Sequence, residues 1–259
     1  MTQLLVSVRN VAEVIAAIEG GADIIDVKDP HRGSLGCAAP DMILAIANAI
    51  GLIKGTRPPL SLALGELQEW LSSDLTSLRN AIQAAMPQFL KLGLAETCTA
   101  QGSASWIAEW QRVRTSIRGT HEWVAVAYAD SEESRSPGID AILQAAIEGG
   151  CRILLIDTHT KNGTSLLDHL TLDALQVIRR QTREHGLKLA LAGSVAQSDL
   201  PLLLQIQPDI IAVRSAVCEH GDRTATVSKD RVQAFRIAMN ERVDPTDGPD
   251  PCDSSVRLV

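Results

Sequence analysis

Short aliphatic runs alternate with longer amphipathic stretches along most of this chain. The aliphatic runs have the length and the apolar content of strands that are buried on both faces, and they lie at 3–8, 23–28, 60–64, 88–92, 123–128, 152–157, 187–192 and 209–214. Stretches with helical periodicity lie between and after them, at 10–19, 40–49, 74–85, 103–117, 138–149, 171–184, 197–206 and 228–240.

Eight strand–helix alternations predict an α/β protein with a (β/α)8 TIM barrel as a single domain over residues 1–242. A doubly wound open sheet is the alternative, but it needs fewer units and usually a glycine-rich turn after its first strand. The segment from Ser7 to Asn10 has no glycine. Weak internal echoes support the barrel register: Asp23-Ile-Ile and Asp209-Ile-Ile open the second and the eighth predicted strands.

Composition and charge narrow the class of protein. The chain has 259 residues, of which 45% are hydrophobic and 3% aromatic, and this composition suits one large aliphatic core. A net charge of −7 argues against nucleic acid or an anionic membrane as partner. The odd number of cysteines without a CxxC pair favours a reducing compartment. We therefore expect a cytoplasmic protein, and we expect residues 243–259, rich in proline and aspartate, to form a flexible tail.

Ionisable residues end several of the predicted strands. Side chains alternate faces along a strand, so Asp26 and Lys28 should point into the barrel together. By the same parity, Lys91 and Asp157 should point inward from the fourth and sixth strands, with Lys161 in the loop beyond. These positions lie at the carboxyl ends of the strands, where TIM barrels place their active sites. The sequence thus predicts two lysines and two aspartates at one mouth.

A lone lysine at a strand end is usually solvated or paired in a salt bridge. Four ionisable groups at one mouth carry a desolvation cost that gives little stability in return, which favours a functional reading. Burial and a neighbouring ammonium lower the pKa of a lysine, and the neutral amine can then attack a carbonyl. Either Lys28 or Lys91 could be that amine, with the aspartates orienting the amines and moving protons.

Small residues after the last two strands suggest a phosphate site. Gly193 and Ser194 follow the seventh strand, and Arg214 and Ser215 follow the eighth, where barrels often bind phosphate through backbone amides. Ser34 lies in the glycine-rich loop 33–36 after the second strand, which could close over a substrate or hold a second anion. The histidines have no metal-ligand spacing, so we expect no metal.

Several of these segments together resemble one known family. The segments are Gly20 to Lys28 (GGADIIDVK), Gly33 to Gly36 (GSLG), Lys91 to Gly93, Leu155 to Thr158 with Lys161, Leu191 to Ser194, and Val213-Arg214 with Gly221 to Arg223. They are similar to the (5-formylfuran-3-yl)methyl phosphate synthases, which start the furan moiety of methanofuran. The resemblance covers about residues 3–240, and its first two segments are the specific ones.

The resemblance implies a condensation of two glyceraldehyde 3-phosphate molecules with loss of one phosphate and two waters. It implies that Lys28 forms a Schiff base, that Lys91 transfers protons, and that Asp26, Asp157 and Lys161 assist. It also implies that the reaction needs no metal and no organic cofactor. Two alternatives stay open. Another lysine-dependent aldolase for a sugar phosphate would use the same residues, and a catalytically silent barrel would only bind a phosphorylated ligand. We expect a small triose phosphate as substrate and a homo-oligomer as the assembly.

Overall fold

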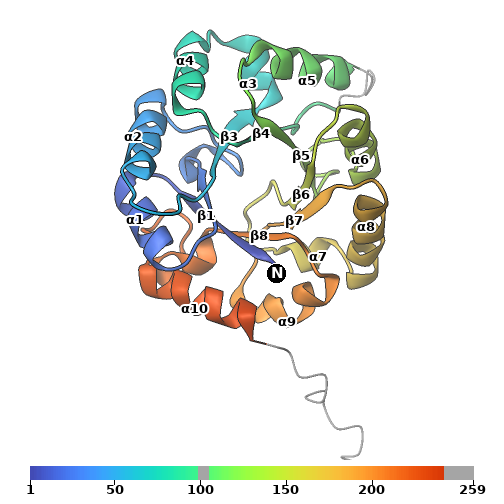
Figure 1. The fold of residues 1–259 in the computed structure, drawn as a ribbon. Coiled ribbons are helices and arrows are strands. Elements are labelled where there is room, and N and C mark those ends of the chain that lie inside the picture. The colour runs from blue at the N-terminus through green and yellow to red at the C-terminus, as the bar shows by residue number, and fades with distance from the viewer. Residues whose placement is uncertain (99–104, 242–259) are drawn as a thin grey trace, which may run out of the picture.

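Eight parallel strands close into a barrel in a computed structural model, which describes residues 1–98 and 105–241 (Figure 1). Each strand pairs with the next in the chain, and the first pairs with the last. This confirms the predicted (β/α)8 barrel. The strands are β1 (Gln3–Val8), β2 (Ile24–Val27), β3 (Leu60–Glu66), β4 (Phe89–Gly93), β5 (Glu122–Tyr128), β6 (Ile153–Asp157), β7 (Lys188–Leu191) and β8 (Ile210–Val213).

The helices form a ring outside the barrel (Figure 1). They are α1 (Val11–Glu19), α2 (Pro40–Gly51), α3 (Leu67–Ser72), α4 (Thr76–Ala85), α5 (Ser105–Ser116), α6 (Ile139–Glu148), α7 (Leu166–His169), α8 (Leu172–Glu184), α9 (Leu200–Leu203) and α10 (Lys229–Asn240). None of these helices has both the length and the apolar content to cross a membrane, as far as the described residues go.

The predicted helices differ from the observed ones in three places. The short helices α3 and α7 were not predicted, because each is too brief to show a helical period. The stretch 197–206, predicted as one helix, is α9 between two 3₁₀ turns, η2 (Gln197–Asp199) and η3 (Leu204–Ile206). The predicted tail, 243–259, lies outside the described residues.

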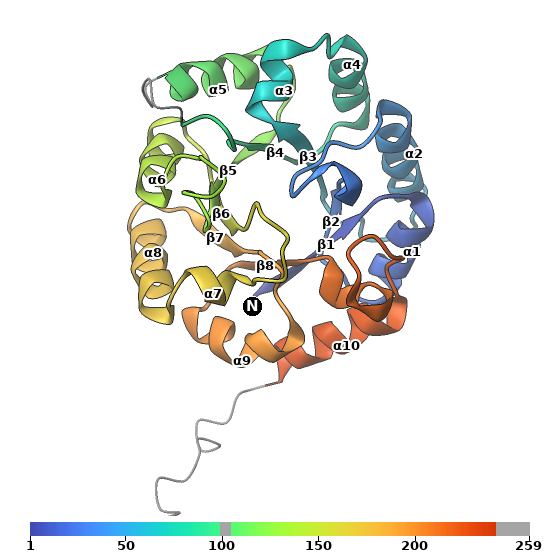
Figure 2. The ribbon, with the colours of Figure 1, turned by 180° about the vertical axis from the view of Figure 1, so that it is seen from behind.

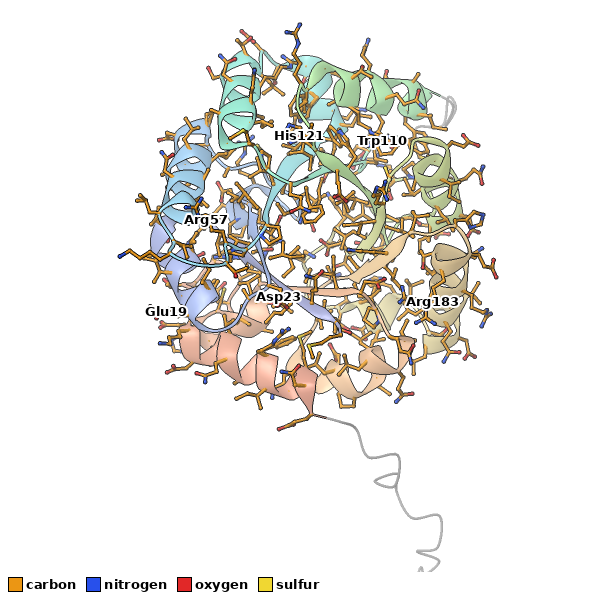
Figure 3. All side chains as sticks on the ribbon, viewed as in Figure 1. Glu19, Asp23, Arg57, Trp110, His121 and Arg183 are labelled. Carbon is orange, nitrogen blue, oxygen red and sulfur yellow. The ribbon has the colours of Figure 1, made fainter. Side chains whose placement is uncertain are left out.

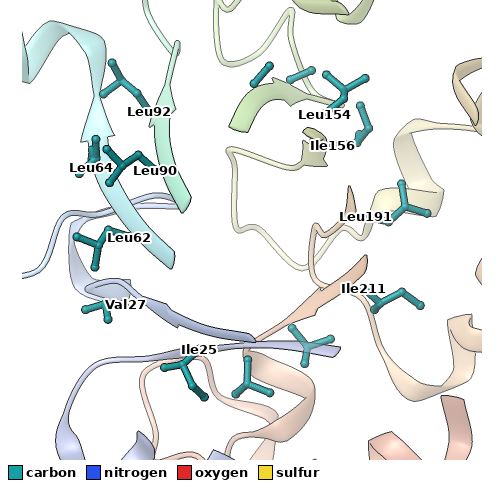
Figure 4. Close-up of a cluster of buried hydrophobic side chains, with 14 of the residues drawn as sticks. Ile25, Val27, Leu62, Leu64, Leu90, Leu92, Leu154, Ile156, Leu191 and Ile211 are labelled. Atoms are coloured by element: carbon teal, nitrogen blue, oxygen red, sulfur yellow. The ribbon is translucent and has the colours of Figure 1, made fainter. Parts of the chain in front are cut away.

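Strand parity sorts the barrel into two apolar layers. Outward-facing aliphatic side chains pack between the strands and the helices, and Figure 4 shows a ring of them that includes Ile25, Val27, Leu90 and Leu92. A smaller inner layer, with Ile24 among its members, fills the barrel itself. The alternation predicted for the second, fourth and sixth strands is confirmed, so Asp26, Lys91 and Asp157 stand on the inner face.

One strand breaks this alternation. On β3, Leu62 and Leu64 face outward and Ala63 faces inward, so simple alternation would place Glu66 outside. The register with β4 shifts between Ala63 and Glu66, however, and Gly65 there has a φ of 80°. A bulge inserts an extra residue and re-aims the side chain that follows. Glu66 is thereby turned toward the carboxyl end of the barrel.

The Asp-Ile-Ile echo marks a repeated device at the amino ends of two strands. Asp23 accepts a hydrogen bond from the Leu4 amide at 2.7 Å and pairs with Arg236 of α10 at 2.7 Å. Asp209 likewise accepts from the Leu189 amide at 2.8 Å and pairs with an arginine of α8, Arg179. Each aspartate therefore fastens a helix to the start of a strand. Asp23, the residue that directly precedes β2, is labelled in Figure 3.

The opposite end of the barrel carries the longer loops. Viewed from that side, the loops after β2, β6 and β8 lie over the end of the barrel (Figure 2). Those three loops are tied together by hydrogen bonds. The Ser34 hydroxyl donates to the Thr158 carbonyl at 2.8 Å, and the Arg223 guanidinium donates to the Gly33 carbonyl at 2.9 Å. The mouth is thus bordered by loops that hold one another in place.

We expect Asp209→Ala to lower the free energy of unfolding by about 2 kcal/mol, because it removes a charge-assisted hydrogen bond and a partly buried ion pair. Asp209→Asn should cost less, since the amide oxygen can still accept from Leu189. Urea denaturation measures both, with Glu184→Gln on the exposed end of α8 as the control, expected within about 0.5 kcal/mol of the wild type. Equal costs for Ala and Asn would contradict the role given to the Leu189 bond.

Candidate active site

Lys28 follows β2 directly and continues its ladder, because its amide donates to the Val8 carbonyl at 3.1 Å. The side chain is half-buried, and its ammonium has neither a hydrogen-bond partner nor an ion-pair partner within the described structure. Burial lowers the pKa of Lys28 to about 8; the charges of Asp157 and Asp26 oppose the shift, and those of Lys91 and Lys161 add to it. A substantial fraction of this amine is therefore neutral near physiological pH.

Asp26 stands two residues before Lys28 on the same inner face and is fully buried. One carboxylate oxygen lies 2.7 Å from the Lys91 Nζ, and the other accepts a hydrogen bond from the Ser7 hydroxyl at 3.0 Å. Lys91 is buried too, 4% exposed. A buried pair of this kind is costly to desolvate, and removing either partner would leave the other charge uncompensated.

Asp157 ends β6 and is surrounded by donors. Its Oδ1 accepts from the Lys161 ammonium at 3.1 Å and from the Thr158 amide at 2.8 Å, and its Oδ2 accepts from the Ser34 hydroxyl at 3.2 Å. Burial would raise the pKa of Asp157, but Lys161, Lys28 and the hydrogen bonds outweigh burial and lower it below the usual value. Asp157 is therefore a carboxylate at neutral pH.

These groups border one cavity at the carboxyl end of the barrel. Lys28, Lys91, Asp157 and Lys161 line it on one side, and the loops after β7 and β8 line it on the other with Gly193, Ser194, Ser215 and Arg223 among others. The backbone of Gly193 and Ser194 is left-handed, with φ of 99° and 53°. Successive amides in such a turn point to one side and form an anion-binding concavity. The amides of both residues lack a protein acceptor within the described chain.

Arg214 lines the same cavity, but its guanidinium is engaged elsewhere. It is 6% exposed, and its nitrogens donate to the Glu13 carboxylate and to three carbonyls, those of Ser7, Arg223 and Ala225. These bonds occupy all five guanidinium hydrogens. The predicted contact of Arg214 with phosphate would need one of them to break. Ser34, also predicted to meet the substrate, is likewise buried and bonded to Asp157 and Thr158.

Two functional candidates escaped the prediction from sequence, and a third, Arg223, entered it only as part of a segment that resembles the family. Arg223 lines the cavity and uses one nitrogen for the Gly33 carbonyl. Tyr128 ends β5 on the inner face and donates to Glu66 at 2.6 Å. The signal for Tyr128 was present, because it is the single tyrosine of the chain and strand parity points it inward. Glu66 gave no such signal, since the bulge reverses its parity.

Known proteins resemble this chain over nearly its whole length. The model of the 4-HFC-P synthase family matches residues 4–236. The chain belongs to the 4-HFC-P synthase family. Among family members, the (5-formylfuran-3-yl)methyl phosphate synthase of Archaeoglobus fulgidus is 34% identical over 239 residues, which cover 92% of this chain and 99% of that protein. That of Methanosarcina barkeri is 32% identical over 232 residues, 89% and 96% of the two chains.

Solved structures that resemble this 4-HFC-P synthase family member are distant in sequence. A phosphoribosyl anthranilate isomerase aligns with a TM-score of 0.58 at 11% identity and covers 92% of this chain and 98% of its own. The thiamine phosphate pyrophosphorylase of Pyrococcus furiosus aligns at 0.56 with 14% identity, over 92% and 95%. At these identities the likeness concerns the fold alone.

Residues 1–98 and 105–241 contain no group of three His, Cys, Asp or Glu side chains placed to hold a metal ion. At the mouth of the family member's barrel, Asp26 pairs with Lys91 and Asp157 with Lys161, so each of these two carboxylates is engaged by an ammonium group.

The pKa of Lys28 gives a direct test by competitive labelling with an amine-reactive reagent. At pH 7 a pKa near 8 instead of 10.5 gives roughly 300-fold more neutral amine, so Lys28 should label far faster than exposed Lys188 in the same digest. Asp157→Asn should move the labelling midpoint of Lys28 to lower pH, because a charge that favours the ammonium is lost. Lys161→Met should move it to higher pH. Midpoints that stay fixed in both variants would contradict this electrostatic account.

Proposed function

We propose that this chain condenses two molecules of glyceraldehyde 3-phosphate to (5-formylfuran-3-yl)methyl phosphate through a Schiff base on Lys28. The family and its curated members supply the reaction class. The observation that carries the mechanism is the unpaired, half-buried amine of Lys28 at the mouth of the barrel. The product would serve the biosynthesis of methanofuran, as the family membership implies.

The first step needs a neutral amine beside a carbonyl carbon. Lys28 supplies it, because burial holds the pKa of this amine near 8. Its nitrogen adds to the carbonyl, water leaves, and an iminium forms. Loss of a proton from the neighbouring carbon gives an enamine, whose carbon attacks the aldehyde of the second triose. Further losses of water and of one phosphate lead to the aromatic ring.

The paired residues supply the proton transfers. Lys91 is held by Asp26 against the inner face of the barrel at 2.7 Å, and we propose that it moves protons to and from the adduct. Asp157 stabilises the iminium charge on Lys28, since its carboxylate already acts on that ammonium. Lys161 is held by Asp157 at 3.1 Å and lines the cavity, where its charge favours an anionic substrate.

The phosphate that stays on the adduct would lie across the cavity from these lysines. Gly193 and Ser194 offer unpaired amides there, Ser215 lines the same wall, and Arg223 offers a guanidinium. Arg223, unlike Arg214, can donate hydrogen bonds to a phosphate, since four of its five guanidinium hydrogens have no acceptor within the described chain. Arg214 supports it, because its Nε donates to the Arg223 carbonyl at 2.6 Å.

We also propose that the substrate is a small triose phosphate, that the protein assembles as a homo-oligomer, and that it is located in the cytoplasm. The acidic balance of the chain, −7, agrees with a small-molecule enzyme that binds no nucleic acid.

Trapping with borohydride tests the Schiff base. Wild-type protein with glyceraldehyde 3-phosphate should give a reduced adduct that maps to Lys28 by peptide mass analysis, together with furan absorbance and free phosphate when the reductant is left out. Lys28→Arg should abolish the adduct, because a guanidinium stays protonated. Lys91→Ala should slow turnover by about 100-fold or more while some adduct remains.

The same experiment separates the alternatives. An adduct at Lys28 with retro-aldol cleavage of a longer sugar phosphate, and without furan, would identify another aldolase. No adduct at either lysine would identify a barrel that only binds its ligand. Full activity in Lys28→Arg would overturn the choice of nucleophile.

Arg223→Ala should raise the KM for glyceraldehyde 3-phosphate by about 10-fold to 100-fold with a smaller change in kcat, because a charge-assisted contact to phosphate contributes about 1.5–3 kcal/mol. Arg223→Lys should recover part of the loss, since it keeps the charge without the fork of donors. Steady-state kinetics measures both, and Arg180→Ala on α8 is the control with the same loss of charge far from the mouth. An unchanged KM in Arg223→Ala would move the phosphate elsewhere.

A further inference from the structure

A second cluster of polar groups lies at the mouth, outside the cavity of the lysines. Glu66 comes from the bulge that ends β3, Tyr128 from the end of β5, and His159 from the loop after β6. The Tyr128 hydroxyl donates to Glu66 at 2.6 Å, and the His159 ring meets the Tyr128 ring edge-on at 5.2 Å. The steps assigned to the three lysines and two aspartates use none of these groups.

The Glu66 carboxylate lies against Gly93, the next inward-facing position beyond Lys91 on β4. Lys91 and Gly93 are two residues apart on β4 and so share its inner face. A side chain at Gly93 would collide with the Glu66 carboxylate, which therefore fills the place that a residue above Lys91 would take. The carboxylate is fixed there by the Ala95 amide at 2.9 Å and by the Tyr128 hydroxyl. The glycine is what lets a carboxyl group from β3 lie over β4.

Tyr128 connects this carboxyl group to the lysine cavity. It is 1% exposed, and it pairs in register with Asp157 on the neighbouring strand. Both face inward, so their side chains are neighbours across one strand spacing. Glu66 is partly exposed at the mouth, whereas Tyr128 is closed off behind it. Glu66 is thus the member of the pair that can meet a substrate.

The condensation needs such a group on this side. One triose would be held between Lys28 and the loops after β7 and β8, so the second must approach from the opposite half of the mouth. We propose that Glu66 is a further catalytic residue, the acid that protonates the oxygen lost as water after the two trioses have joined, and that Tyr128 is its positioning residue. This proposal rests on the proposed function.

Once the trioses have joined, the attacking carbon next to the iminium carbon has no hydrogen left, so the proton comes from the former aldehyde carbon of the second triose. A base among the lysine-site groups removes this proton. The C–H electron pair forms a carbon–carbon double bond to the attacking carbon, which expels its hydroxyl. The C–O bond breaks with its electron pair on oxygen, and Glu66 gives that oxygen a proton. One water leaves, and the proton taken by the base returns to Glu66 through solvent or Tyr128.

The surroundings of Glu66 suit an acid. Burial raises the pKa of its carboxyl group, whereas the hydrogen bonds from Tyr128 and Ala95 and the charge of His159 lower it, and the charge of Glu69 on α3 raises it. Burial is the largest of these effects, so the proton-holding form extends to higher pH than for an exposed glutamate. The pKa of Tyr128 is raised by its burial and by Glu66, which keeps its hydroxyl protonated as a donor.

The experiment compares Glu66→Gln and Tyr128→Phe with Glu122→Gln, a control at the far end of β5. Borohydride trapping of Lys28 and release of the furan product are measured side by side with glyceraldehyde 3-phosphate. In Glu66→Gln we expect wild-type amounts of Lys28 adduct, furan release reduced by about 100-fold or more, and a trapped adduct that retains the water the wild type has lost. Tyr128→Phe should reduce kcat by about 10-fold with KM nearly unchanged.

The pH dependence of the activity distinguishes a catalytic role of Glu66 from a merely structural one, because a structural role would leave this dependence unchanged. The limb of the profile that titrates with Glu66 should shift to higher pH in Tyr128→Phe, because the lost hydrogen bond had favoured the carboxylate. The limb near pH 8 that belongs to Lys28 should stay. In Glu66→Gln the first limb should disappear, and Glu66→Asp should restore it with part of the activity.

Failure of this proposal is distinct from failure of the proposed function. Absence of a Lys28 adduct in the wild type overturns both. A normal adduct in the wild type, combined with normal furan release in Glu66→Gln or with an unmoved profile in Tyr128→Phe, overturns the role of Glu66 alone. Loss of adduct and product together in a folded Glu66→Gln protein would make the pair a support of the barrel rather than an acid.

Discussion

The unpaired amine of Lys28 depends on two ion pairs that do not include it. Asp26 and Asp157 lie close enough to influence its charge, yet the first is committed to Lys91 at 2.7 Å and the second to Lys161 at 3.1 Å. Either aspartate, if it lost its own lysine partner, could form an ion pair with Lys28 and stabilise the protonated amine. The other two lysines prevent this, and burial then lowers the pKa of the remaining amine to about 8. With three lysines and two aspartates at the mouth, the amine of Lys28 is therefore the one that has no carboxylate partner.

The mouth of the barrel is divided by this arrangement into halves with different chemistry. The loops after β7 and β8 offer amides and Arg223, which favour an anion. The ends of β3 and β5 offer a carboxyl group and a phenol joined at 2.6 Å. Lys28 stands between them at the end of β2. A reaction that joins two phosphorylated aldehydes and then expels water needs an anchor on one side and an acid on the other.

The residues that hold the loops and side chains of the site in place are as polar as the residues of the site itself. All the guanidinium hydrogens of Arg214 are donated to Glu13 and to backbone carbonyls of β1 and of the loop after β8. Ser34 fixes Asp157 from a loop that follows a distant strand. The fully buried charges of Arg214, Glu13 and Asp157 are tolerated because each of them has a partner. Position next to a strand end therefore does not by itself tell a substrate-facing residue from one that holds the loops in place.

Much of the fold and of the lysine site follows from the sequence. The eight aliphatic runs fix the barrel, and strand parity places Asp26, Lys91 and Asp157 on its inner face, because a strand has only two faces and one must be apolar toward the helices. The family resemblance then singles out Lys28. Only the tertiary structure decided which charged groups are already engaged. The guanidinium of Arg214 is engaged by Glu13, which lies on α1 after β1. Glu66 faces the mouth because of a bulge at Gly65, which the alternation of side chains along β3 does not reveal. Pairing between residues far apart in the chain depends on how loops and bulges meet in space, and a local pattern carries no record of that meeting.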